Sequence, residues 1–384
     1  MKKILINLGV IAASFVLILM IGELSLRIIH YFKWKRPLFF ADKGTAEPLY
    51  PEKKLGWRAT EGYFSQWIAY DAAGKPYQVR GTTDKNGFRF FGNPDSNRIK
   101  IFVLGDSFTQ AAEVSNEKTY YALLAKNFNN LELFAYGAGG YGTLQEYLIL
   151  DEFIDRIRPK ILLLQLCTND FYRNDYDLEH RIWNNPLRRR PYLDAQGKIF
   201  YKNPGKFSFL VSDTLLDNSR LVYYVFLKIN KLMVYLNRNN KINIESNAFM
   251  HRAYLRSVDT TRKIMAMIKK RTPGVEIFTF CADDAQPFYD EMRKLSEESG
   301  FHFIDGVPQA IREAEKQGKV TKHEDRGHWN ELGHLLVAEQ LTAYFREHEV
   351  LKKLSQATPQ NQPAEFRPLH PAGLPNGKLT DAPG

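Results

Sequence analysis

The stretch that decides the fold is "KIFVLGDSFTQ", residues 100–110, in which an apolar run stops abruptly at Gly105-Asp106-Ser107. The apolar part has the length and continuous hydrophobicity of a strand that is covered on both faces. A serine directly after such a strand has two interpretations. It caps the helix that follows, or it is a nucleophile held at the strand end. The rest of the chain has to decide between them.

Strand-like apolar runs alternate with longer helical patterns from Ile101 onward. This alternation predicts an α/β protein with a three-layer, doubly wound parallel sheet over residues 99–350. The runs that we expect to form strands are "KIFVLG", "LELFAYG", "KILLLQLC", "VEIFTF" and "FHFIDG". The intervening patterns that we expect to form helices include "TLQEYLILDEFIDRI", "QPFYDEMRKLSEES" and "ELGHLLVAEQLTAYF".

The N-terminus carries a long apolar segment, "ILINLGVIAASFVLILMIG", preceded by Lys2 and Lys3. A cleaved signal peptide is the alternative to a membrane anchor. The run is long for a signal core, no small-x-small cleavage site follows, and the pattern continues as an amphipathic segment in which Glu23 and Arg27 are spaced to pair. We therefore predict an uncleaved, single-pass transmembrane anchor and juxtamembrane segment over residues 1–36.

Basic residues lie on both sides of the apolar segment, so the positive-inside rule does not fix its orientation. We predict that the catalytic body lies outside the cytoplasmic membrane, in the periplasm or the extracellular space. The net charge of +10 suits an anionic partner such as lipid headgroups or an acidic polysaccharide. No nucleic-acid-binding module is visible, and "RRR" at 188–190 fits a solvated loop.

Three further segments depart from the alternating pattern. Residues 44–98 hold aromatic residues and turn signals without a helical period, which predicts a small β-rich accessory segment. Residues 175–247 form an insertion with a hairpin turning at Gln196-Gly197, followed by a helical stretch, and the insertion could cover a site. Residues 354–384 are rich in proline and polar residues, which predicts a disordered tail.

Polar residues and glycines follow the apolar runs. In a doubly wound sheet ligands bind at the carboxyl ends of the strands, so these residues are the functional candidates. Together they supply a hydroxyl nucleophile, backbone donors, a side-chain amide and an Asp/His pair, which acyl transfer requires. Separately they also fit turns, an Asx turn and a surface histidine. The candidates are Ser107, the glycines at 137, 139, 140 and 142, Asn169, Asp283, Asp284, Asp325 and His328.

At these positions the chain resembles the SGNH hydrolases, also called the GDSL esterase/lipase family. The four blocks of that family match "VLGDSFT" at Ser107, "GGYGT" at Gly140, "CTND" at Asn169 and "DRGHWN" at Asp325 and His328. The resemblance implies a flavodoxin-like fold and ester hydrolysis. It does not extend to the accessory segment, the insertion or the tail.

The residue types define a mechanism. Ser107 is a weak nucleophile, so His328 has to accept its proton, and Asp325 holds the imidazole in the required tautomer. The backbone N–H groups of Ser107 and Gly140 and the amide of Asn169 form the predicted oxyanion hole.

Two positions depart from the family pattern. Cys167 stands where the third block often has glycine, and Ala135 replaces an asparagine that is common before the second-block glycines. Neither position supplies the chemistry, so the departures bear on the substrate more than on catalysis. The chain has only Cys167 and Cys281, and two buried free thiols are favoured over a single disulfide bridge.

The remaining polar residues near the site receive structural roles. Asp106 is expected to fix the turn, and His334, which lies more than a turn into the last helix, is expected to be structural. His323 and Glu324 could replace a missing triad member, but Asp325 and His328 make that unnecessary. No metal or cofactor is predicted, because Asp283 and Asp284 have no partners at ligand spacing.

The sequence thus favours a membrane-anchored serine esterase acting on carboxylic esters, with short acyl groups such as the O-acetyl groups of a glycan as the preferred substrate. A lipase or thioesterase would use the same residues. An O-acyltransferase acting on a cell-envelope polysaccharide, with a sugar hydroxyl in place of water, is the second hypothesis. A non-catalytic glycan-binding protein is the third.

Overall fold

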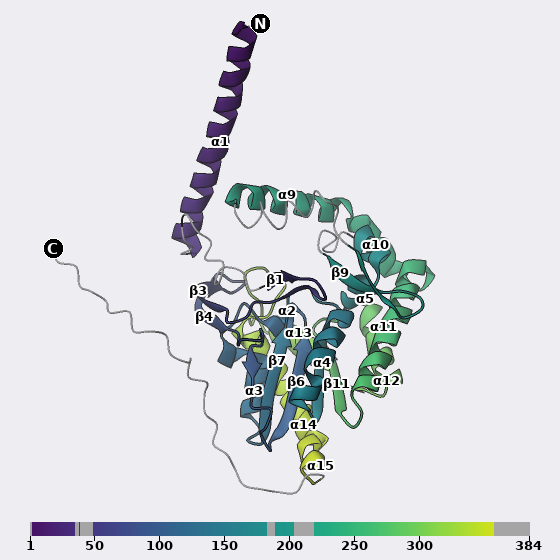
Figure 1. Cartoon of the computed structure of the whole chain (residues 1–384). Coiled ribbons are helices and arrows are strands. Elements are labelled where there is room, and N and C mark those ends of the chain that lie inside the picture. The colour runs from purple at the N-terminus through teal and green to yellow at the C-terminus, as the bar shows by residue number, and fades with distance from the viewer. Residues whose placement is uncertain (1, 35–37, 39–48, 183–188, 203–218, 357–384) are drawn as a thin grey trace, which may run out of the picture.

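The computed structural model describes residues 2–34, 38, 49–182, 189–202 and 219–356 (Figure 1). The predicted tail falls outside the described residues from 357 onward. Its first residues, up to Gln356, belong to a short terminal helix, α15 (Val350–Gln356).

The core of the described chain is a six-stranded sheet with the strand order β12-β11-β8-β6-β7-β5. Neighbouring strands from β12 to β7 are parallel, and β5 joins the edge antiparallel to β7. The parallel strands thus have the flavodoxin-like order 2-1-3-4-5, which confirms the predicted fold class. Their bounds are β5 (Phe90–Phe91), β6 (Ile99–Gly105), β7 (Leu131–Gly137), β8 (Ile161–Leu166), β11 (Glu276–Cys281) and β12 (His302–Phe303).

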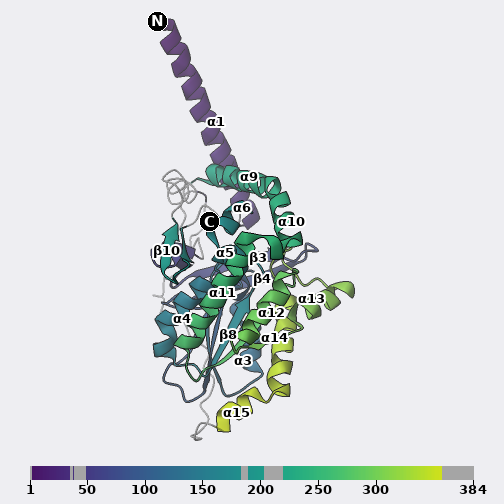
Figure 2. The ribbon, with the colours of Figure 1, turned by 90° about the vertical axis from the view of Figure 1, so that its right-hand side faces the viewer.

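Helices cover both faces of this sheet, as the two views show (Figures 1 and 2). Phe102 and Leu104 of β6 pack into one buried cluster with α4, α11 and α12. Ile101 and Val103 point the other way, into a second cluster with α3, α13, α14 and α15. Alternate residues of one strand thus serve two cores, which explains why the strand is apolar throughout. The helices are α3 (Tyr120–Lys126), α4 (Thr143–Ile157), α11 (Arg252–Arg271), α12 (Phe288–Glu298), α13 (Val307–Lys316) and α14 (Glu331–Glu347).

Strands β6 and β7 end side by side, and Gly105 lies opposite Gly137 where the two strands pair. The short helix α2 (Ser107–Gln110) turns directly across the end of β7. A Cβ atom on Gly137 would lie 2.2 Å from the backbone nitrogen of Gln110. Only glycine permits this approach. The close approach fixes the position of the Ser107 turn on the sheet.

The segment before β6 is built from short antiparallel strands. Its β1–β2 and β3–β4 pairs form separate two-stranded sheets, and β5 completes the central sheet. The segment touches the carboxyl edge of that sheet, because the Trp57 indole donates a hydrogen bond of 2.9 Å to the carbonyl of Gly139. The strands are β1 (Leu49–Glu52), β2 (Gly56–Ala59), β3 (Phe64–Tyr70) and β4 (Pro76–Thr82).

The insertion contains the predicted hairpin and helix. Strands β9 (Arg190–Leu193) and β10 (Ile199–Lys202) pair antiparallel, with Gly197 in the turn at a φ of 80°. The helical stretch forms α9 (Arg220–Leu236) and continues into α10 (Arg238–Ser246). The remaining elements are α5 (Asp170–Asn174), α6 (Tyr176–Arg181) and the 3-10 turns η1 (Asn116–Lys118) and η3 (Ala248–Met250).

The N-terminal helix α1 (Lys2–Trp34) projects away from the body (Figure 1). Its segment Lys3–Ile29 is long and apolar enough to cross a membrane, and no residue of its most apolar window is buried. A signal sequence would pass the same test of length and composition. The predicted pair is present, with Arg27 Nε 2.6 Å from Glu23 Oε1.

Candidate active site

The turn after β6 presents Ser107 as the first residue of α2. Asp106, not Ser107, caps this helix, because its carboxylate accepts a hydrogen bond of 3.0 Å from the backbone N–H of Phe108. The interpretation of Ser107 as a helix cap is therefore wrong, and Asp106 fixes the turn as expected. Ser107 is half-buried, and its hydroxyl has no hydrogen-bond partner among the described residues. The turn offers a free serine at the carboxyl edge of the sheet.

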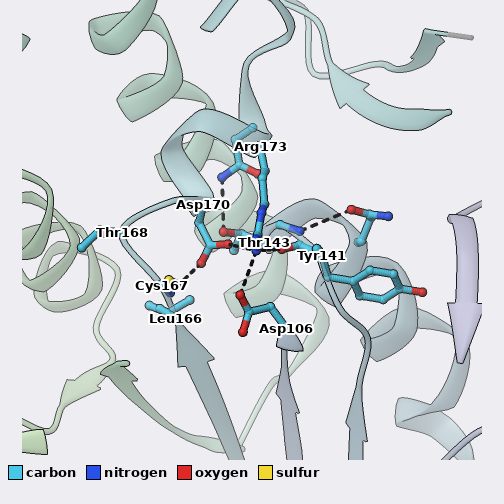
Figure 3. Close-up of polar contacts among 12 residues, drawn as sticks. Asp106, Tyr141, Thr143, Leu166, Cys167, Thr168, Asp170 and Arg173 are labelled. Carbon is cyan, nitrogen blue, oxygen red and sulfur yellow. Dashed lines mark hydrogen bonds and ion pairs between the residues drawn. The ribbon is translucent and has the colours of Figure 1, made fainter. Parts of the chain in front are cut away.

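A buried ionic cluster lies beneath this turn. Figure 3 shows Arg173 of α5 reaching Asp106, with the Arg173 Nη1 atom 2.8 Å from Asp106 Oδ2 and 2.5 Å from the Tyr141 carbonyl oxygen. The Asp170 carboxylate accepts the backbone N–H of Cys167. Burial raises the pKa of Asp170 to about 8, and burial together with Asp170 and Asp106 raises the pKa of Glu146 well above its usual range. Arg173 thus forms an ion pair with Asp106, while burial favours the neutral form of Glu146.

The loop before α14 brings Asp325 and His328 together. The His328 Nδ1 atom lies 2.5 Å from Asp325 Oδ2, and the backbone N–H of His328 donates to Asp325 Oδ1 at 3.1 Å. Because Nδ1 faces the carboxylate, Nε2 is the ring nitrogen left for a substrate or a nucleophile. The ring of Phe108, next to Ser107, lies 5.4 Å from the imidazole between centroids. Among the described residues no hydrogen bond joins Ser107 to His328, a bond that often closes only when substrate binds.

A second carboxylate, Glu113, approaches the same imidazole. Its Oε1 atom lies 3.5 Å from His328 Nδ1, and its side chain is largely buried. Burial lowers the pKa of His328, but the Asp325 hydrogen bond and the charge of Glu113 outweigh it and raise that pKa to about 9. Sequence reasoning missed Glu113, because no spacing links it to His328 and only the folded loops bring the two together.

Glu113→Gln should shift the pH profile of any His328-dependent reaction. The base form of His328 has to accept a proton, so kcat/KM should rise with pH toward an apparent pKa near 9 in the parent protein. Removing the Glu113 charge destabilises the imidazolium, so the rising limb should move to lower pH by roughly one unit. The measurement is kcat/KM for an activated ester between pH 6 and about 10.

Glu117→Gln is the matched control, because Glu117 is an exposed carboxylate in η1. Its profile should superimpose on that of the parent protein. Identical profiles for Glu113→Gln and the parent would show that Glu113 does not act on His328.

The predicted oxyanion donors lie at the ends of β6, β7 and β8. Within the described chain the backbone N–H groups of Ser107 and Gly140 donate no hydrogen bond. The backbone N–H of Gly139, in contrast, donates one of 2.8 Å to the side-chain oxygen of Gln110. Asn169 stands at the start of α5 without making a side-chain cap, and its Oδ1 atom is buried without a partner. The Asx-turn interpretation of Asn169 therefore fails, and the amide is left for another role.

Asp283, at the end of β11, positions the segment that carries Asn169. Its carboxylate accepts the backbone N–H of Thr168 at 2.9 Å and the Thr168 hydroxyl at 2.5 Å. Asp284 instead pairs with Arg312. The sequence analysis found no partner for Asp283. Its contact with Thr168, at the end of β8, exists only because β8 and β11 pair in parallel and end side by side.

Glu113, Asp325 and His328 also form the one candidate metal group found in the described part of the chain, with ligand atoms within 4.8 Å of one another. The nitrogen that would face a metal is Nδ1, which already holds the short hydrogen bond to Asp325. The arrangement matches a base oriented by carboxylates, and the three residues provide no independent sign of a cation.

The other candidates have structural surroundings. His334 is buried, accepts the backbone N–H of Tyr120 on Nδ1 at 3.2 Å and has its pKa lowered to about 3 by burial. It is structural, as predicted. His323 is buried against Trp67 beside Asp325. Cys167 and Cys281 are buried free thiols, which confirms the favoured interpretation.

Several solved structures similar to this chain are described as hydrolases or esterases. An α/β hydrolase from the metagenome of Lake Arreo, Spain, shares 16% identity over 65% of this chain and 94% of its own, with a TM-score of 0.37. A lipolytic protein of the G-D-S-L family from Veillonella parvula shares 13% over 64% and 98%, with a TM-score of 0.36. An acetylxylan esterase from Geobacillus stearothermophilus shares 15% over 66% and 94%, with a TM-score of 0.34.

No family model and no curated protein matches the sequence. The similarity to the solved structures is distant, so the fold assignment rests on the strand order, and the assignment of the site rests on the residues at the carboxyl edge of the sheet.

Proposed function

We propose that the protein is a membrane-anchored serine esterase that hydrolyses short-chain carboxylic esters, with O-acetyl groups of a cell-surface or secreted glycan as the substrate. The observation that carries the proposal is the oriented base. His328 is held by Asp325 at 2.5 Å, on the same sheet edge as the free hydroxyl of Ser107. The apolar helix α1 supports the anchoring, and the net charge of +10 suits an anionic envelope.

The mechanism is acyl transfer through a covalent ester. His328 Nε2 takes the proton of Ser107 as its oxygen attacks the substrate carbonyl, and Asp325 stabilises the imidazolium that forms. The backbone N–H groups of Ser107 and Gly140 and the side-chain amide of Asn169 donate hydrogen bonds to the oxyanion. His328 then returns the proton to the leaving alcohol. Water, deprotonated by His328, releases the acid and restores Ser107.

A serine-directed fluorophosphonate tests the proposal on the full-length protein in detergent. The probe should form one adduct, which peptide mass spectrometry should place on Ser107, and the labelled protein should lose hydrolysis of p-nitrophenyl acetate. Adducts confined to other residues, or hydrolysis that survives complete labelling of Ser107, would remove the nucleophile assignment.

The insertion favours acyl transfer to a sugar as a second candidate. Arg190 of β9 is buried, and its Nη2 atom donates a hydrogen bond of 2.8 Å to the carbonyl of Gly140, next to the predicted oxyanion donor. The insertion therefore borders the site and could limit access of water. Acetyl release and acetyl transfer to an added oligosaccharide, measured in one reaction, separate the two candidates. Transfer exceeding release would establish the transferase.

A further inference from the structure

Helix α9 exposes an apolar stripe. Val225, Ile229, Leu232 and Leu236 recur at the spacing of one helix face, and their exposed fractions lie between 47% and 60%. A continuous apolar stripe of this kind marks a surface that a partner or a membrane covers.

The stripe is bordered by a mixed row of aromatic and basic side chains. The row consists of Tyr224, Lys228, Lys231 and Tyr235, all exposed. The Lys228 ammonium lies 5.1 Å from the centre of the Tyr224 ring. α9 contains no acidic residue, and exposed Arg238 and Lys241 continue the positive charge into α10. Apolar side chains bordered by tyrosine and lysine are typical of a helix that lies in a membrane interface and contacts anionic headgroups.

One flank of the stripe is less exposed than the stripe itself. Val222, Phe226 and Met233 are half-buried there. Val234 points away from the stripe on the same helix and is 48% exposed. The stripe and the basic row are therefore neighbouring exposed surfaces of α9, and Val234 marks the side of the helix opposite the stripe.

The level of α9 along α1 is fixed by Glu23. Its carboxylate accepts the Ser219 hydroxyl at 2.8 Å and the backbone N–H groups of Arg220 and Leu221 at 3.0 and 2.8 Å. Glu23 thus satisfies the first donors of α9 from another helix. The twenty residues from Ile4 to Glu23 rise about 30 Å, the thickness of the hydrocarbon core. A membrane spanned by this part of α1 therefore ends at the level where α9 begins.

α9 also runs in the direction expected of a helix that lies along the surface of such a membrane. α9 lies crosswise beside the lower part of α1 in both views, and α15 marks the far end of the body (Figures 1 and 2). The short helix α2, which carries Ser107, lies on the side of the sheet that faces α9 and α1 (Figure 1).

We propose that α9 lies in the headgroup layer of an anionic bilayer and holds the active-site edge of the sheet toward the membrane. This inference rests on the anchoring in the proposed function. Val225, Ile229, Leu232 and Leu236 enter the boundary of the acyl chains, while Lys228 and Lys231 contact anionic headgroups. The esters within reach are consequently those presented close to the membrane surface.

Site-directed fluorescence on the full-length protein in vesicles tests the inference. Leu232→Cys and its control Val234→Cys are labelled with an environment-sensitive fluorophore, the native thiols being buried. The vesicles contain phosphatidylglycerol and phosphatidylcholine, with a spin label at the shallow acyl position. The label at 232 should be quenched by the spin-labelled lipid and should be about threefold less accessible to iodide than the label at 234. Replacing phosphatidylglycerol by phosphatidylcholine should reduce this difference.

Ile18→Cys, labelled in the same way, reports on the anchor. If the label at 18 is quenched by lipid while the label at 232 is as open to iodide as that at 234, the anchor stands and the inference fails. Iodide protection at 232 without lipid quenching, growing with protein concentration, would assign the stripe to a second copy and also overturn the inference. If spin-labelled lipid does not quench the label at position 18, α1 is not inserted in the bilayer and the proposed anchoring is wrong. None of these readings depends on ester hydrolysis.

Discussion

Ser107→Ala is expected to reduce kcat/KM for p-nitrophenyl acetate by about 10⁴-fold or more, to the background set by binding and the oxyanion donors. The serine oxygen is the only atom that forms the acyl-enzyme in this mechanism. Its loss therefore abolishes the covalent pathway, whereas the loss of an oxyanion donor would only raise its activation barrier. The measurement is initial-rate hydrolysis by the full-length protein in detergent, after circular dichroism has shown that the variant is folded.

Ser299→Ala is the matched control for this substitution. Ser299 caps the carboxyl end of α12, at the opposite end of the β11–β12 unit from the carboxyl edge of the sheet, and the same change there should leave kcat/KM within about twofold of the parent. Hydrolysis by Ser107→Ala at a rate close to that of the parent would place the nucleophile elsewhere. His328→Ala should lose about as much as Ser107→Ala, because the two residues act as one unit and their effects do not add.

Arg173→Met is expected to lower the free energy of unfolding by about 3–5 kcal/mol. The Arg173 guanidinium is buried, and it pairs at 2.8 Å with Asp106, whose carboxylate shapes the Ser107 turn. Methionine fills part of the volume but leaves the Asp106 charge without a partner, and an unpaired buried charge is costly. Chemical unfolding of the full-length protein in detergent, followed by tryptophan fluorescence, measures the loss.

Glu146→Gln is the control within the same cluster. Burial and the neighbouring carboxylates raise the pKa of Glu146 well above its usual range and so favour its neutral form, whose shape and charge glutamine keeps. The free energy of unfolding should change by less than about 1 kcal/mol. A loss as large as that of Arg173→Met would mean that Glu146 is ionised and that the ionic cluster is balanced differently.

The sheet and its helices could be predicted because their signals are local. Each parallel strand is covered on both faces, so "LELFAYG" and "KILLLQLC" are apolar throughout, and β7 and β8 lie where they were expected. The edge strand β5 could not be predicted. Only Phe90 and Phe91 pair with β7, and the antiparallel direction is set by the path of the accessory segment, not by a repeat in the sequence.

The candidate site divides in the same way. Asp325 and His328 are three residues apart, so their contact follows from one loop, and Asn169 follows a recognisable strand. Glu113 and Asp283 reach the site from other loops, and no short-range pattern links them to it. The opposing shifts of His328, toward a pKa of about 9, and of His334, toward about 3, depend on burial and neighbouring charge in the fold.

The two outermost strands of the sheet have a consequence for behaviour at high protein concentration. β5 and β12 are each only two residues long. An exposed sheet edge offers unpaired N–H and C=O groups on which another chain can add a strand, and length makes that template effective. Edges this short offer little to pair with. Copies at high concentration are therefore protected from joining their sheets into aggregates.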